Sequence, residues 1–165
     1  MNKTKNIFYA ALALLTMPFV SLSQEKPSSV FPLLSKYYDL KNALINSDAA
    51  GASKYANEFI TLVKTVDVKT LAPNEQSLFQ SLKGKLIDDA NDVASGKDLV
   101  KQRAALQTLS DNMIMLVRTA KPSKRTYVAY CPMKKAYWLS AEPVIKNPYY
   151  GNSMLTCGKV TETLN

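Results

Sequence analysis

Residues 30–46 read VFPLLSKYYDLKNALIN, and their apolar side chains return every three or four positions. The apolar positions of this stretch are 30, 33, 34, 37, 40, 44 and 45. This spacing puts them on one face of an α-helix, and Pro32 suits the first turn, where its missing N–H costs nothing. The run 46–48, NSD, interrupts the pattern, and Asp48 or Ser47 can cap a following helix. The stretch therefore predicts a helix with one buried face.

Three further segments repeat this period. Their apolar positions are 52, 55, 56, 59, 62, 63 and 66; then 78, 79, 82, 86, 90 and 93; then 99, 106, 109, 113, 116 and 117. Pro73 fits the first turn of the third segment, and Asp98 can cap the fourth. Amphipathic helices joined by short connections are typical of an antiparallel four-helix bundle.

Two polar residues, Arg103 and Ser110, fall on the apolar side of the fourth segment. Arg103 can lie at the edge of that face, with its head group in water, or form an internal ion pair with Asp39 or Asp48. Since long basic side chains are rarely fully buried, the sequence favours the first arrangement.

After Pro122 the pattern changes. Residues 127–130 and 137–139 are typical of short strands, 147–152 of a turn, and 154–163 of a short strand or a helical turn. We expect this segment to pack its Trp and Tyr rings over the helices. The predicted fold is thus mainly α, an antiparallel four-helix bundle with a short irregular or β C-terminal tail packed on it. Residues 30–165 form a single domain, in which 127–164 is the segment with the Cys and Met motifs.

Residues 1–23, MNKTKNIFYAALALLTMPFVSLS, combine a basic start, an apolar stretch and small residues Ser21 and Ser23 before Gln24. This pattern predicts a cleaved secretory signal peptide, followed by a disordered lead-in over 24–29. The apolar stretch is short for a bilayer span, and no cysteine follows it for a lipid anchor. We therefore expect a periplasmic or secreted protein with no stable membrane anchor and no nucleic-acid partner.

The composition argues against an enzyme. The chain has no histidine, so Ser-His-Asp and Cys-His catalysis and nearly all histidine-ligated catalytic zinc sites are excluded. Its five glycines form no phosphate-binding loop. Paired carboxylates such as Asp88 and Asp89 are more typical of a solvated helix face. We expect no enzymatic activity.

The two cysteines of the chain each have a methionine nearby: Cys131 with Met133, and Cys157 with Met154. An exported protein can join the cysteines in a disulfide. Thiolates and thioethers are also the ligands that Cu(I) prefers, and methionine can simply fill a core. Residue types alone leave a structural disulfide, a soft-metal site and chance all open.

Several motifs resemble a bacterial family of domains of unknown function. They are Tyr130-Cys131-Pro132-Met133, Trp138-Leu139-Ser140, Asn147-Pro148-Tyr149-Tyr150-Gly151 and Met154-Leu155-Thr156-Cys157-Gly158. The helical part agrees in residues 38–44 with Asp48, and in Gln102-Arg103 with Leu109-Ser110. Members of that family occur as stand-alone exported proteins and fused to the C-terminal end of periplasmic adaptor subunits of RND-type heavy-metal (copper/silver) efflux pumps.

The resemblance implies a role in transition-metal handling, with Cys131, Met133, Met154 and Cys157 as the metal ligands. We therefore expect an exported Cu(I)-binding protein that acts as a chaperone, buffer or efflux accessory, with a heavy-metal efflux system or another envelope protein as partner. The alternative is a non-enzymatic envelope interaction module whose two cysteines form a structural disulfide.

Overall fold

The structure is a computed structural model that describes residues 30–96 and 98–165. The expected signal peptide and lead-in, residues 1–29, lie outside these ranges. The described residues form four α-helices, α1 (Val30–Ile45), α2 (Ala49–Thr65), α3 (Pro73–Ser95) and α4 (Leu99–Ala120), and three strands, β1 (Thr126–Cys131), β2 (Ala136–Ser140) and β3 (Lys159–Leu164). Two short 3-10 helices, η1 (Val68–Thr70) and η2 (Gly151–Ser153), lie in the connections. The mainly helical class predicted from the sequence is confirmed.

The helices begin where the local signals predict. Asp48 accepts a hydrogen bond from the Gly51 amide at 2.8 Å and caps α2, and Asp98 accepts one from the Lys101 amide at 2.9 Å and caps α4. Pro73 occupies the first turn of α3. Each cap satisfies an amide that has no partner within its own helix.

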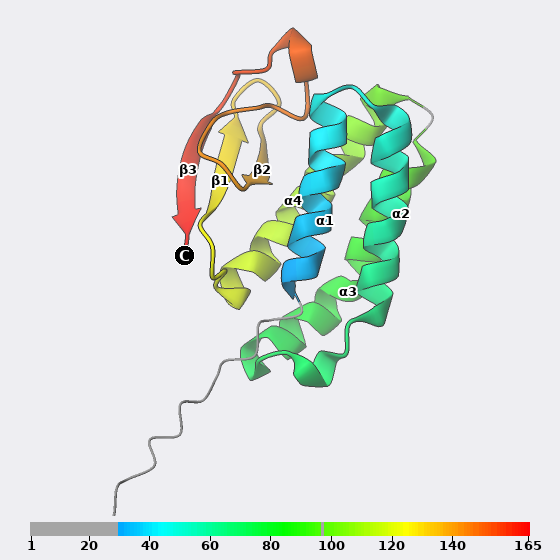
Figure 1. The fold of residues 1–165 in the computed structure, drawn as a ribbon, viewed down its shortest axis with the longest axis vertical. Helices are drawn as coiled ribbons and strands as arrows, with labels where there is room; N and C mark the ends of the chain where they lie inside the picture. The colour runs from blue at the N-terminus through cyan, green and yellow to red at the C-terminus, as the bar shows by residue number, and fades with distance from the viewer. Residues whose placement is uncertain (1–29, 97) are drawn as a thin grey trace, which may run out of the picture.

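The helices pack in chain order, α1 against α2, α2 against α3 and α3 against α4, and α1 also contacts α4 (Figure 1). The apolar faces identified from the sequence meet in one continuous core. It includes Leu33, Phe59, Phe79 and Leu106, each fully buried. Every helix in the described part of the chain falls short of the length and apolarity that crossing a membrane requires.

The C-terminal segment is more regular than the expected irregular or β tail. It forms a three-stranded antiparallel sheet in the order β2-β1-β3. The first two strands lie where the sequence predicts them, and β2 packs against α4. β3 has only exposed and half-buried positions before Leu164. Its apolar alternation is therefore weak, and its pairing with β1 decides its conformation.

Ser110 and Arg103, the two polar residues on the apolar side of α4, each contact another element of the fold. The Ser110 hydroxyl lies 2.7 Å from the Tyr37 hydroxyl of α1, which accepts a hydrogen bond from the Leu139 amide of β2 at 3.2 Å. Arg103 is half-buried, and in the described residues it forms no ion pair with Asp39 or Asp48. Its guanidinium donates to the Leu44 carbonyl at 2.8 Å and to the Ser47 hydroxyl at 3.0 Å. It thus binds the C-terminal end of α1, where backbone carbonyls lack helical partners and a cation is favoured.

Candidate metal centre

The sheet brings the two cysteines together. Cys131 ends β1, and Cys157 precedes β3 by two residues; the two strands pair in the register Tyr130 opposite Lys159. The end of β1 and the start of β3 therefore meet at one end of the sheet, the upper end in Figure 1. The two thiol sulfurs lie 3.6 Å apart, and both cysteines are free. A disulfide bond measures about 2.05 Å, so the sulfurs are in contact without being bonded.

The two sulfurs have different environments. Cys131 is fully buried, whereas Cys157 is half-buried. Burial opposes ionisation of Cys131, but hydrogen bonds to its sulfur from the Lys134 amide, the Asn147 side chain and Cys157 outweigh it and lower its pKa. Burial, the hydrogen bond to Cys131 and the charge on Cys131 raise the pKa of Cys157. Cys131 therefore ionises more readily than Cys157, and the thiolate is the form that binds metals and reacts.

Gly158 lets the chain pass closely over the indole of Trp138. It has a φ of +147°, a conformation that glycine adopts at little cost. A Cβ at this position would lie 2.7 Å from the Trp138 ring and 2.9 Å from the Tyr130 carbonyl oxygen. Glycine at this point therefore allows Cys157 to approach Cys131, and the buried indole forms an apolar wall beside the chain.

The methionines lie at the surface near the cysteines. Met133 is in the turn between β1 and β2 with 65% of its side chain exposed, and Met154 follows η2 with 37% exposed. The Met154 carbonyl accepts a hydrogen bond from the Cys157 amide at 3.1 Å, which ties the two residues in one turn. The structure brings the two thiols into contact and leaves both methionines partly exposed to solvent. In the described residues, no group of three or more His, Cys, Asp and Glu side chains is arranged to hold a metal ion.

Asn147 is a site residue that sequence reasoning identified only as part of a turn. It is fully buried and donates from its amide nitrogen to the Cys157 carbonyl at 2.6 Å. Its amide oxygen accepts from the Tyr149 backbone N–H at 2.8 Å, and its own backbone N–H donates to the Leu155 carbonyl at 2.8 Å. Asn147 thereby fixes the loop that carries Cys157. In the sequence, the polar and proline-containing run around Asn147 indicated a turn, but it did not indicate that Asn147 is buried.

These features define a class of protein: a mainly helical domain with a small C-terminal antiparallel sheet that holds two adjacent free thiols. Comparison with protein families gives one match, to the family described as protein of unknown function (DUF3347), over residues 33–125. The chain belongs to this family. The match covers nearly all of α1 and the whole of α2–α4 and ends before β1, so the cysteines lie beyond the matched residues. Searches of curated proteins and of solved structures find no match.

Proposed function

We propose that the chain is an exported protein that binds Cu(I), or Ag(I) as its analogue, through Cys131 and Cys157. In this role it acts as a chaperone, a buffer or an accessory of a heavy-metal efflux system outside the cytoplasm. The scaffold for this function is the antiparallel four-helix bundle expected from the sequence, with segment 127–164 packed on it.

The contact between the two thiols is the observation that carries the proposal. A thiolate binds a metal ion such as zinc at about 2.3 Å, so two sulfurs that share one ion lie at most about 4.6 Å apart. The separation of 3.6 Å between Cys131 and Cys157 falls within this limit. The two sulfurs can therefore bind one ion with little movement of the backbone.

The donor set favours a soft ion. The chain has no histidine and two cysteines, so the four nitrogen or sulfur ligands that structural zinc requires are missing. Cu(I) accepts thiolates and thioethers. Methionine has three rotatable side-chain bonds, so Met133 and Met154, each close in sequence to a cysteine, can turn their thioethers toward an ion held by the thiols. The buried indole of Trp138, which lies against Gly158 next to Cys157, supplies an apolar wall that limits access of water.

The test is an anaerobic titration of the reduced chain with Cu(I) in the presence of the Cu(I) chelator bicinchoninate as competitor. We expect one ion bound per chain. Cys131→Ser or Cys157→Ser should weaken binding about 100-fold or more, equivalent to about 2.8 kcal/mol. Met133→Leu and Met154→Leu should each weaken it about 10-fold with little effect on folding, because leucine nearly conserves the volume of methionine.

Met115→Leu is the matched control, because Met115 is 47% exposed on α4, outside the C-terminal segment. This variant should bind Cu(I) as the wild type does. The proposal fails if the reduced wild type takes up no Cu(I) against the competitor, or if both serine variants bind as tightly as the wild type.

The contact between the thiols also supports the second candidate function, an envelope interaction module stabilised by a Cys131–Cys157 disulfide. The sulfurs need to approach by about 1.5 Å to form that bond. A thiol count on the chain isolated from the cell envelope without reductant separates the two functions. No free thiols, together with no Cu(I) uptake after reduction, would favour the interaction module.

A further inference from the structure

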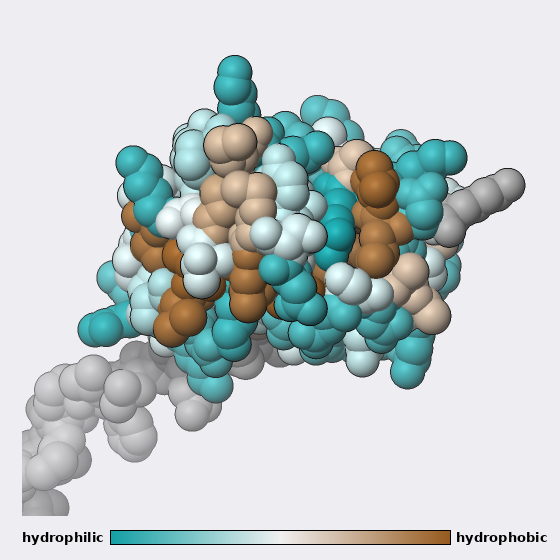
Figure 2. Space-filling view, turned by 90° about the horizontal axis from the view of Figure 1, so that it is seen from above, coloured by the Kyte–Doolittle hydropathy of each residue, from teal (hydrophilic) through white to brown (hydrophobic). Residues whose placement is uncertain are grey.

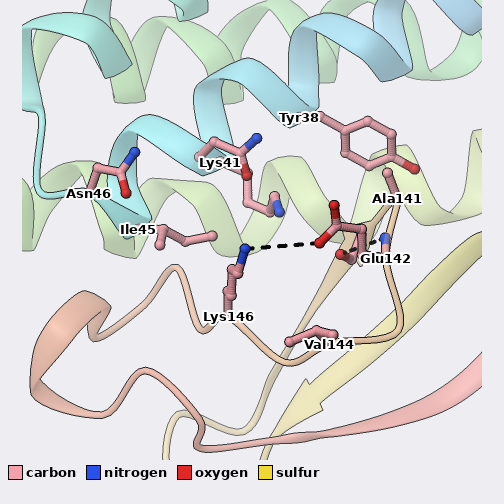
Figure 3. A pocket seen from close by; sticks show the side chains of 10 residues that line it. Tyr38, Lys41, Ile45, Asn46, Ala141, Glu142, Val144 and Lys146 are labelled. Carbon is pink, nitrogen blue, oxygen red and sulfur yellow. Dashed lines mark hydrogen bonds and ion pairs between the residues drawn. The ribbon is translucent and has the colours of Figure 1, made fainter.

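A pocket unrelated to the cysteines lies between α1 and the loop that follows β2 (Figure 3). Its volume is about 270 Å³, close to the lower end of the range for small-molecule sites. Its polar lining comes from Tyr38, Lys41, Asn42, Asn46, Ser140, Glu142 and Lys146, and its apolar lining from Ile45, Ala141 and Val144. Seven of the ten lining residues are polar, so the pocket offers mainly charged and hydrogen-bonding groups to a ligand, with a small apolar wall.

Lys41 is the central group of this pocket. Its side chain comes from α1 and points into the pocket, toward Glu142 and Lys146 (Figure 3). The residue is only 5% exposed. Within residues 30–96 and 98–165 its amine makes no hydrogen bond and no ion pair; its nearest aromatic ring, that of Tyr38, has its centre 6.0 Å away. Most of the residue is removed from water and the amine faces the pocket, so an anion bound there would stabilise its positive charge.

A second cation and a carboxylate lie at the mouth of the pocket. The Lys146 amine is 3.9 Å from the Glu142 carboxylate, and the two side chains are 54% and 68% exposed. A solvent-exposed pair at this separation contributes little to stability. The Glu142 side chain can therefore move out at low cost and leave its place beside Lys146 to another carboxylate.

We propose that this pocket binds a small organic carboxylate, such as a short-chain fatty acid. The carboxylate of the ligand pairs with Lys41 and takes the place of Glu142 beside Lys146. Its short apolar chain lies against Ile45 and Val144. Glu142 thus acts as an internal competitor that covers Lys146 when no ligand is present.

This inference is independent of the metal proposal, because none of the pocket residues is among the candidate metal ligands. Several observations favour a carboxylate over a neutral ligand: the unpaired Lys41 amine, the adjacent Lys146, and the protein's own carboxylate already at the mouth. The pocket volume favours a ligand of only a few carbon atoms.

The test is a titration of the ¹⁵N-labelled chain with butyrate, followed by the backbone amide shifts of residues 141, 142 and 144–146. Butyramide, which has the same shape without the charge, and inorganic phosphate are titrated in parallel at constant ionic strength. We expect saturable shifts with butyrate and none with butyramide. Saturation with phosphate but not with butyrate would overturn the assignment of a carboxylate, and equal binding of butyramide would overturn the role of the charge.

Three variants identify the groups responsible. Lys41→Met should weaken butyrate binding about 10-fold or more, and Glu142→Gln should tighten it several-fold because the competing carboxylate is gone. Lys85→Met removes an exposed lysine of α3 and should leave binding unchanged. If Lys41→Met does not fold, Glu142→Gln still tests the proposal. Unchanged or weaker butyrate binding by Glu142→Gln would overturn it. A loss of butyrate affinity in Lys85→Met as large as that in Lys41→Met would also overturn it.

Discussion

Lys41 is an ionisable residue whose environment disfavours its charged form. Burial and, to a smaller extent, the positive charge of Lys146 lower its pKa from 10.5 to about 8, while Glu142 partly offsets them. These two residues and Tyr38 are the other titratable groups that line its pocket, and burial raises the pKa of Tyr38. In the unfolded chain the amine regains its ordinary pKa.

This difference predicts a pH-dependent stability. Below pH 8 the amine is protonated in both states, so the penalty of burial is fully present, about 3 kcal/mol for a difference of this size. Between pH 8 and 10.5 the unfolded chain binds more protons than the folded one, so the free energy of unfolding rises with pH. Lys41→Met should therefore be more stable than the wild type at pH 7, with the gap shrinking toward pH 10.

Urea unfolding of the two proteins from pH 6 to 10 measures this gap. Lys85→Met serves again as the control, since an exposed lysine carries no such penalty and its stability difference from the wild type should change little with pH. A constant gap between wild type and Lys41→Met across this range would show that Lys41 keeps an ordinary pKa in the folded chain.

At the scale of elements, Tyr37 joins the sheet to the helices. β2 is an edge strand, and its outward-facing Leu139 amide has no strand partner on that side. The Tyr37 hydroxyl accepts that amide's hydrogen bond and lies in contact with the Ser110 hydroxyl, so one phenol links α1, α4 and β2. Covering an edge strand in this way also prevents it from pairing with another chain.

Tyr37→Phe should lower the free energy of unfolding by about 1–3 kcal/mol, because it leaves a buried amide and a buried hydroxyl without their partner. Urea unfolding followed by the fluorescence of Trp138, the single tryptophan of the chain, measures the change. In the described residues the hydroxyl of Tyr55 makes no hydrogen bond, so Tyr55→Phe is the matched control. An equal loss of unfolding free energy in Tyr37→Phe and Tyr55→Phe would contradict the role of the Tyr37 hydroxyl in linking the sheet to the helices.

At the scale of the whole molecule, helices and sheet share one core. Trp138 and Leu139 of β2 are buried in the same apolar cluster as Leu106 and Met113 of α4. The family match nevertheless ends before β1, at the boundary between helices and sheet. Seen from above, where the sheet connections and η2 lie over the helix ends, the surface shows hydrophobic patches interrupted by hydrophilic side chains (Figure 2).

The shared core predicts that residues 30–165 unfold as one unit. Far-UV circular dichroism, which reports the helices, and Trp138 fluorescence, which reports the sheet, should give coincident thermal and urea transitions. An earlier transition by fluorescence would instead make segment 127–164 a separately folding unit on a helical domain. Reduced and oxidised samples should be compared, because a Cys131–Cys157 bond constrains the unfolded chain and raises the stability of the unit that contains it.

The helical part was predictable to a large extent because its signals are local. Periodic apolar positions indicated the four helices, and Asp48, Pro73 and Asp98 indicated where helices begin. The site was predictable only as a set of residue types. Cys131 and Cys157 were candidates for their chemistry, whereas the surface exposure of Met133 and Met154 depends on how the loops pack.

Other features had no reliable signal in the sequence. In the sequence, Lys41 lies next to the apolar positions of its helix, as an ordinary surface lysine does. It is buried because the loop after β2 covers that side of α1. The contact of Arg103 with the end of α1 depends on the crossing of two helices far apart in the chain. The third strand also escaped firm prediction, because its side chains are mostly exposed or half-buried.

The amino-acid sequence by itself determined the helices, their caps, the absence of histidine chemistry and the four sulfur residues of the candidate site. These properties depend on composition and on interactions between residues a few positions apart. Only the tertiary structure decided that the two thiols meet at 3.6 Å and that Lys41 lies in a pocket where, among the described residues, its amine forms no ion pair. Both follow from the pairing of β1 with β3 and from the packing of a loop on α1, which join residues distant in the chain.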